Sequence, residues 1–121
     1  MTSDWNAFLD SLSPGLKALR GGQAEVMTGF SAIAKAALKP GALDGKNKEL
    51  IALGICVAMR CDDCIGFHVK AAIEKGASRE EILEAMGMAI YMGAGPSVMY
   101  AAHAVAAFDQ LSGARNAVAA E

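Results

Sequence analysis

The sequence lacks any segment in which polar and apolar residues alternate for long enough to predict a β-strand, so we expect an all-α protein. It also lacks a run of basic residues, and its formal net charge is −2. A nucleic acid or an anionic membrane surface is therefore not an expected partner. The first residues, Met1–Trp5, lack the basic and then apolar order of a signal peptide, which favours a cytoplasmic protein.

Long unbroken apolar runs are also absent. The longest uncharged stretch, residues 85–103, is interrupted at Gly93–Pro96, so we expect no transmembrane helix there. The chain is nevertheless 54% hydrophobic, above the usual share of about 45–50%. One small core does not need that much apolar surface, and we therefore expect copies of the chain to associate.

Helical periodicity and local end signals predict one domain, residues 1–121, built as a compact bundle of about six helices. The core is expected at about 45–108, and residues 1–40 should extend that core or an interface. Ser78 and Glu81 form a capping-box pattern, and the tail 114–121 is expected to fray. The expected helices run from Ser3 or Asp4 to Leu12, from Ser13 to Leu38 with a weak point at Gly21–Gly22, and then over 46–59, 61–75, 78–93 and 96–112.

Cysteine is scarce, with three residues in the chain, but two of them form a Cys-x-x-Cys pattern at the start of the fourth expected helix. Cys61, Cys64 and His68 fall on one helical face. A helix start favours the thiolate that thiol chemistry needs, and a histidine one turn on can share its proton. Asp62 and Asp63 oppose a thiolate by their charge, although we expect their side chains to point away from the sulfurs. The sequence leaves open whether these opposing effects raise or lower the pKa of the cysteine thiols.

Together with Glu49 in the preceding helix, these residues resemble the alkylhydroperoxidase D-like (AhpD-like) branch of the carboxymuconolactone decarboxylase family, over roughly residues 45–108. The resemblance implies a thiol-dependent peroxidase or disulfide reductase. Cys64 would be the peroxidatic sulfur that becomes a sulfenic acid, and Cys61 would donate a proton and then resolve that acid to a disulfide. Glu49 and His68 would form a proton relay.

The resemblance also implies partners. The substrate would be an alkyl hydroperoxide or a partner disulfide, and an external dithiol or lipoyl-type reductant would reset the site. No cofactor or metal is expected, and the subunits would form a homotrimer or a homohexamer. One position departs from the family pattern, because well-known members carry a second histidine just before the second cysteine, where this chain has Asp63. The relay is therefore shorter here.

Two other classes of function stay open at this stage. A lyase or hydrolase of the decarboxylase branch would not depend on Cys61 and Cys64. A metal-binding or purely structural oligomer would need zinc ligands beyond the two cysteines and His68, with His103 or Glu49 completing the set. Without such a role, His103 is expected to be a packing or interface residue. The third cysteine, Cys56, is expected to be a small core residue, and Met86, Met88, Met92 and Met99 are expected in the core or an interface.

Overall fold

The computed structural model describes residues 4–120, and it describes side chains as far as residue 113. Within that part of the chain every regular element is a helix, which confirms the predicted all-α class. The elements are α1 (Trp5–Ser11), α2 (Ser13–Gly22), α3 (Ala24–Leu38), α4 (Gly45–Ala58), α5 (Asp62–Glu74) and α6 (Arg79–Ala120).

Two helix boundaries differ from or refine the sequence prediction. The weak point at Gly21–Gly22 is a full break, because Gln23 leaves the helical region with φ −132° and ψ 52°, and two glycines in a row weaken a helix. The cysteine pair consequently begins the fifth helix rather than the fourth. The predicted end near residue 112 is wrong, since α6 continues to Ala120. The alternative cap Ser3 and the final residue of the expected frayed tail, Glu121, lie outside the described residues.

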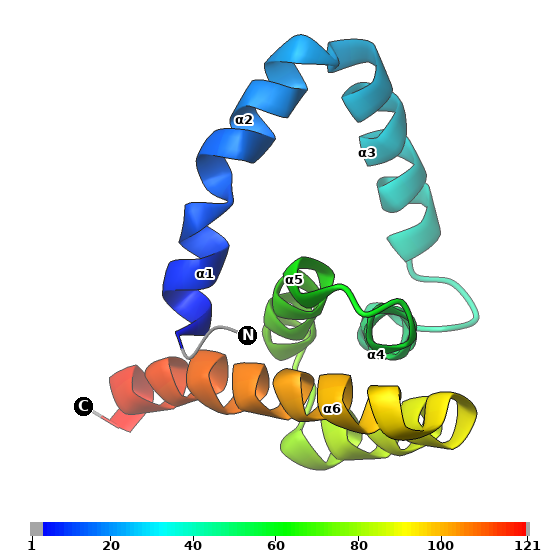
Figure 1. Ribbon diagram of the computed structural model, residues 1–121, viewed down its shortest axis with the longest axis vertical. Coiled ribbons are helices and arrows are strands. Elements are labelled where there is room, and N and C mark those ends of the chain that lie inside the picture. Colours follow the sequence, from blue (N-terminus) through cyan, green and yellow to red (C-terminus); the bar gives the residue numbers. More distant parts are fainter. Residues whose placement is uncertain (1–3, 121) are drawn as a thin grey trace.

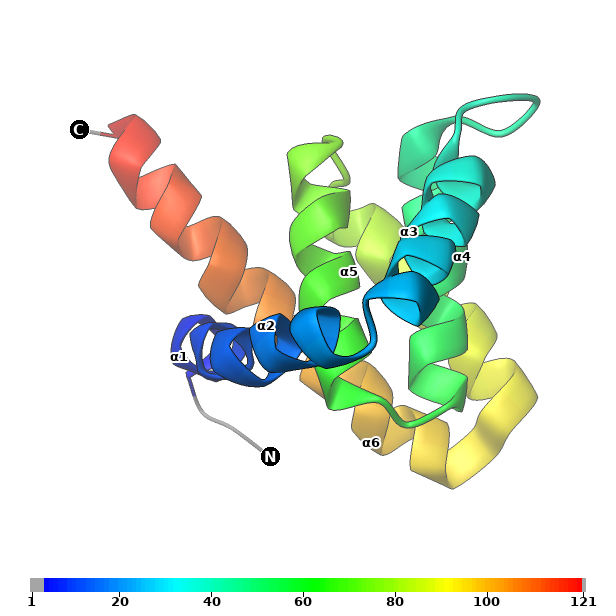
Figure 2. The ribbon, with the colours of Figure 1, turned by 90° about the horizontal axis from the view of Figure 1, so that it is seen from above.

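The long helix α6 contains a sharp internal turn. Ala94 has φ 56° and ψ −142°, outside the helical region, and Pro96 follows two residues later. Figure 2 shows the resulting corner in the yellow part of α6, where the helix changes direction. The predicted break at Gly93–Pro96 is therefore confirmed. By length and composition alone, residues 79–113 could cross a membrane, but this corner divides them into two shorter helices.

The core lies where α4 and α5 pack against both arms of α6 (Figure 1). The helix α1 joins this core through Trp5, which is fully buried, and Leu9. A Cβ atom on Gly66 of α5 would approach Leu9 Cδ2 to 2.6 Å, so α1 can pack this closely only against a glycine. The main buried side chains of the cluster are Trp5, Leu53, Val57, Ile65, Val69, Ile82, Met86 and Phe108.

The helices α2 and α3 form a V-shaped arm that leaves this core. Figure 1 shows α2 rising away from the bundle and α3 returning towards α4. Neither helix contains a buried residue. The arm is attached at its returning end, where Lys48 Nζ of α4 donates hydrogen bonds to the carbonyl oxygens of Ala37, at 2.9 Å, and Lys39, at 2.6 Å. It therefore exposes apolar side chains that nothing in the described part of the chain covers.

Candidate dithiol site

The turn between α4 and α5 sets the position of the first cysteine. Arg60 lies in the left-handed region with φ 58°. Its N–H donates to the Val57 carbonyl, and the N–H of Cys61 donates to the Cys56 carbonyl, both at 3.1 Å. This is the hydrogen-bond pattern of a Schellman motif, which ends a helix and redirects the chain. Because of this turn, α5 begins directly after the end of α4.

Cys61 is the N-cap of α5, and its Sγ accepts a hydrogen bond from the N–H of Cys64 at 3.3 Å. A disulfide joins Cys61 to Cys64, with Cα atoms 5.3 Å apart. Both residues are only partly buried, so the sulfurs lie near the molecular surface. After reduction, the unpaired N–H groups and the dipole of the helix start would favour a thiolate at this position.

The structure brings Glu49 of α4 beside His68 of α5. The distance from Glu49 Oε2 to His68 Nδ1 is 2.6 Å, and Glu49 is only 2% exposed. Where Glu49 is ionised, its carboxylate can only accept a hydrogen bond, so His68 donates from Nδ1 and Nε2 is left for proton exchange. His68 follows Cys64 by one helical turn on α5. The three side chains thus lie on two neighbouring helices, α4 and α5.

The structure also contains a second carboxylate–imidazole pair, which the sequence did not predict. Asp62, the first residue of α5, lies with its Oδ1 2.7 Å from Nδ1 of His103 on α6. The ring of Tyr100 packs on that imidazole, with ring centroids 4.8 Å apart. The available signal was that His103 lies in an otherwise uncharged segment, residues 85–108, where a polar ring needs a partner. Asp63, by contrast, is exposed.

Cys56 behaves as the predicted core residue. It is buried and free, and burial raises the pKa of its thiol to about 11. The thiol is therefore protonated at neutral pH, and a protonated buried thiol is a poor nucleophile. This distinguishes Cys56 from the two cysteines at the helix start.

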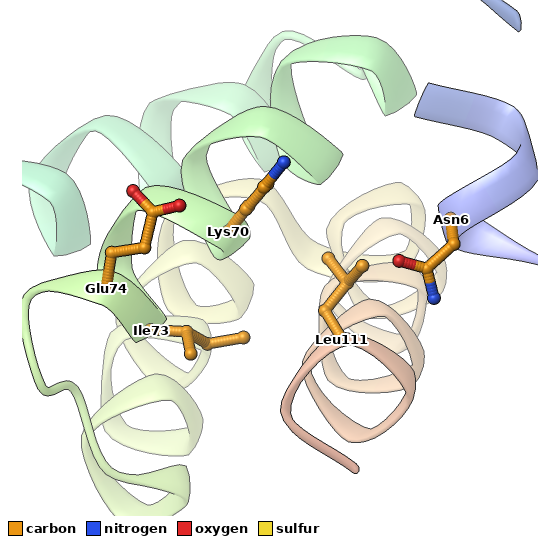
Figure 3. A pocket seen from close by; sticks show the side chains of 5 residues that line it. All are labelled: Asn6, Lys70, Ile73, Glu74 and Leu111. Carbon is orange, nitrogen blue, oxygen red and sulfur yellow. The ribbon is translucent and has the colours of Figure 1, made fainter. Parts of the chain in front are cut away.

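Several hollows lie away from the sulfurs, and two of them adjoin α5 and α4. One, of about 320 Å³, lies at the far end of α5 and is lined by Lys70, Ile73, Glu74, Asn6 and Leu111. Figure 3 shows Ile73 and Leu111 inside it and the polar side chains around it. The other is an apolar groove of about 530 Å³ between α4 and the first arm of α6. Neither hollow is lined by a cysteine.

The described part of the chain contains no set of residues that could bind zinc as the metal-binding hypothesis requires. Among those residues, no three His, Cys, Asp or Glu side chains lie close enough together to hold a metal ion. The two histidines are each engaged at Nδ1 by a separate carboxylate.

A helical domain with a dithiol at a helix start and a buried glutamate–histidine pair beside it matches a known family. Residues 24–107 match the model of the carboxymuconolactone decarboxylase family, and the chain belongs to that family. The AhpD-like branch indicated by the sequence is consistent with this membership.

Several relatives extend the similarity over nearly the whole chain. A carboxymuconolactone decarboxylase family protein from Legionella pneumophila, lpg0406, is 49% identical with a TM-score of 0.87, covering 89% of this chain and 96% of its own. A Thermotoga maritima family protein, TM1620, for which a part in the antioxidative response has been suggested, is 30% identical with a TM-score of 0.80, over 89% and 92%. An uncharacterised Cupriavidus necator protein is 39% identical over 93% of this chain and 99% of its own.

Proposed function

We propose that this protein is a thiol-dependent peroxidase or disulfide reductase whose redox centre is the pair Cys61 and Cys64. The observation that carries the proposal is the buried Glu49 carboxylate, which holds His68 one helical turn from Cys64. A buried carboxylate is costly unless it is paired, and such groups gather at functional sites. The suggested antioxidative role of the Thermotoga maritima relative points in the same direction.

In the proposed oxidative half-reaction, the Cys64 thiolate attacks the outer oxygen of a hydroperoxide. The O–O bond breaks, the alcohol leaves with a proton from the His68–Glu49 pair, and Cys64 becomes a sulfenic acid. The Cys61 sulfur then attacks Cys64, an S–S bond forms, the S–O bond breaks and water leaves. Two thiols and one hydroperoxide thus give one disulfide, one alcohol and one water.

In the proposed reductive half-reaction, an external dithiol or lipoyl-type reductant resets the pair. Its thiolate attacks the Cys61–Cys64 disulfide and forms a mixed disulfide, which the second thiol of the reductant resolves. The same exchange can be run with a partner protein disulfide as oxidant in place of the hydroperoxide. A cytoplasmic location would suit this cycle, because thiol reductants are maintained there.

Steady-state turnover tests this function. Purified protein is supplied with cumene hydroperoxide and dihydrolipoamide, and hydroperoxide consumption is followed for the wild type, Cys64→Ser and Cys56→Ala. We expect consumption in the wild type and in Cys56→Ala, and a loss of at least a hundredfold in Cys64→Ser, since the attacking sulfur is removed. Equal consumption in wild type and Cys64→Ser would refute the proposal.

We also propose that the protein is a homo-oligomer, a trimer or a hexamer, in which a second copy covers the apolar arm. Val26, Phe30 and Ile33 follow one another at helical spacing on α3, and each is more than 60% exposed. Isolated helices of this length are marginal in water, so a buried face is needed to hold them. The apolar groove between α4 and α6 on another copy, with Ile55 and Met92 at its surface, has matching chemistry.

A further inference from the structure

Two carboxylate–imidazole pairs flank the start of α5, and they share one pattern. In each pair a carboxylate oxygen lies within 2.7 Å of a histidine Nδ1. One pair joins α4 to α5 through Glu49 and His68, and the other joins α5 to α6 through Asp62 and His103. The proposed function uses only the first pair. The second pair stands next to Cys61 in the chain and has no role in the relay that the sequence indicates.

The negative charge of Asp62 by itself would disfavour the thiolate form of the neighbouring Cys61. Asp62 directly follows Cys61, the N-cap of α5, and a carboxylate beside a sulfur disfavours the thiolate. Its side chain is about 27% exposed, so water screens its charge only in part. Among the neighbouring charged groups, Asp63 is a second anion, Glu49 is paired with His68, and the cation Arg60 is exposed to water, which screens its charge.

His103 reduces this effect of the Asp62 charge on Cys61. Its side chain is 16% exposed, and it lies in the partly buried space between α6 and the first turn of α5. It holds the Asp62 carboxylate in a charge-assisted hydrogen bond, and such bonds are stronger than neutral ones where water is partly excluded. Tyr100 packs against the imidazole and limits its rotation. The carboxylate is therefore oriented towards α6 and its charge is partly compensated.

We propose that His103 is a positioning residue that acts through Asp62 to favour the thiolate form of Cys61. This inference rests on the proposed dithiol function. In the resolving step, the Cys61 proton passes through water to His68, which gave its own proton to the alcohol, and the Cys61 thiolate attacks the Cys64 sulfenic acid. The S–S bond forms, hydroxide leaves, and a proton from His68 converts that hydroxide to water. The Glu49–His68 pair thus serves Cys64, and the Asp62–His103 pair serves Cys61.

The test measures the thiolate of each cysteine separately and needs no peroxidase turnover. Alkylation by iodoacetamide is followed against pH in a Cys56→Ala/Cys64→Ser protein, where only Cys61 remains. His103→Phe, which keeps a ring beside Tyr100, should slow alkylation of Cys61 at neutral pH by about three- to tenfold. His103→Asn, whose side-chain amide can keep a hydrogen bond to Asp62 without the imidazole ring, should fall between that variant and the parent.

The double variant decides between an electrostatic and a merely structural role. If His103 acts through the charge of Asp62, then Asp62→Asn/His103→Phe should restore alkylation of Cys61 to at least the parent rate. A double variant that is as slow as His103→Phe alone would overturn the proposal. The matched control carries Cys56→Ala/Cys61→Ser and reports on Cys64, whose alkylation His103→Phe should leave unchanged; an equal slowing there would also overturn it. These outcomes are independent of whether the protein consumes peroxide.

Discussion

At the scale of single residues, the buried carboxylate Glu49 is the most demanding feature of the site. It is 2% exposed, and its described partner is His68. Removing one member of a buried ion pair leaves the other without compensation, which costs more than removing both. We therefore expect the loss of either member of the Glu49–His68 pair to change the stability of the protein as well as its activity.

We predict that His68→Ala lowers the free energy of unfolding by about 2 kcal/mol at neutral pH, because it strands the Glu49 carboxylate. Glu49→Leu/His68→Ala should be more stable than His68→Ala, although it lacks one more native side chain. Urea denaturation of the oxidised proteins measures both values. If the double variant is instead the less stable one, Glu49 is not held as an ionised carboxylate by His68.

Cys56 gives a prediction for alkaline pH. Burial raises the pKa of its folded-state thiol to about 11, from an ordinary value of 9.0. Above pH 9 the unfolded chain therefore loses this proton before the folded protein does, so rising pH favours unfolding. We expect the wild type to lose about 2 kcal/mol more stability than Cys56→Ala between pH 9 and pH 11. Denaturation of both oxidised proteins across that range checks the difference, and parallel curves would contradict it.

At the scale of helices, the ends of α4 and α5 offer a matched comparison. Both helices end in the same hydrogen-bond pattern, with Arg60 at φ 58° after α4 and Gly76 at φ 86° after α5. Only glycine adopts this region without a steric penalty. The turn that positions Cys61 therefore carries a local cost that the other turn does not.

We predict opposite effects at these two positions. Gly76→Ala should destabilise the protein by about 1 kcal/mol, whereas Arg60→Gly should stabilise it by roughly 0.5 kcal/mol, less than the full strain because glycine also gains freedom in the unfolded chain. Thermal unfolding of the two variants beside the wild type measures this. A loss of stability in Arg60→Gly would mean that the Arg60 side chain itself holds the turn.

Much of the helical pattern could be predicted because helix ends are encoded locally. The capping box is one example, since the N–H of Glu81 donates to Ser78 Oγ and Ser78 N–H donates to Glu81 Oε1. The corner at Gly93–Pro96 is another. The pair of Asp62 and His103 could not be predicted, because it joins distant parts of the chain and depends on how α5 packs on α6. The roles of Glu49, Cys61, Cys64 and His68 remain predictions.

At the scale of the whole molecule, the exposed apolar faces are the main feature that one copy leaves unexplained. The sequence correctly indicated helical structure over residues 13–38 with a weak point at Gly21–Gly22, but not that the apolar side chains of α2 and α3 would be left uncovered. Apolar spacing identifies a face, whereas its partner is a tertiary or quaternary property. Similarly, Ile51 and Ile55 of α4 are exposed beside the groove.

We predict that the protein sediments as a trimer or a hexamer at micromolar concentration, and that Phe30→Glu shifts it towards smaller species by placing a charge on the α3 face. Lys17→Glu, on the arm but outside the apolar stripe, is the matched control and should leave the assembly unchanged. Sedimentation velocity reports both. A wild type that is monomeric throughout this range would contradict the proposed assembly.

The central claim is that Cys61 and Cys64 form a reversible redox pair that reduces a hydroperoxide. Its most direct test is the intact mass of fully reduced protein before and after one equivalent of cumene hydroperoxide, with the product mapped by peptide digestion. We predict loss of two hydrogens, a Cys61–Cys64 disulfide, one equivalent of alcohol, and return to the starting mass with dihydrolipoamide. An unchanged mass, or oxidation confined to methionine, would contradict it.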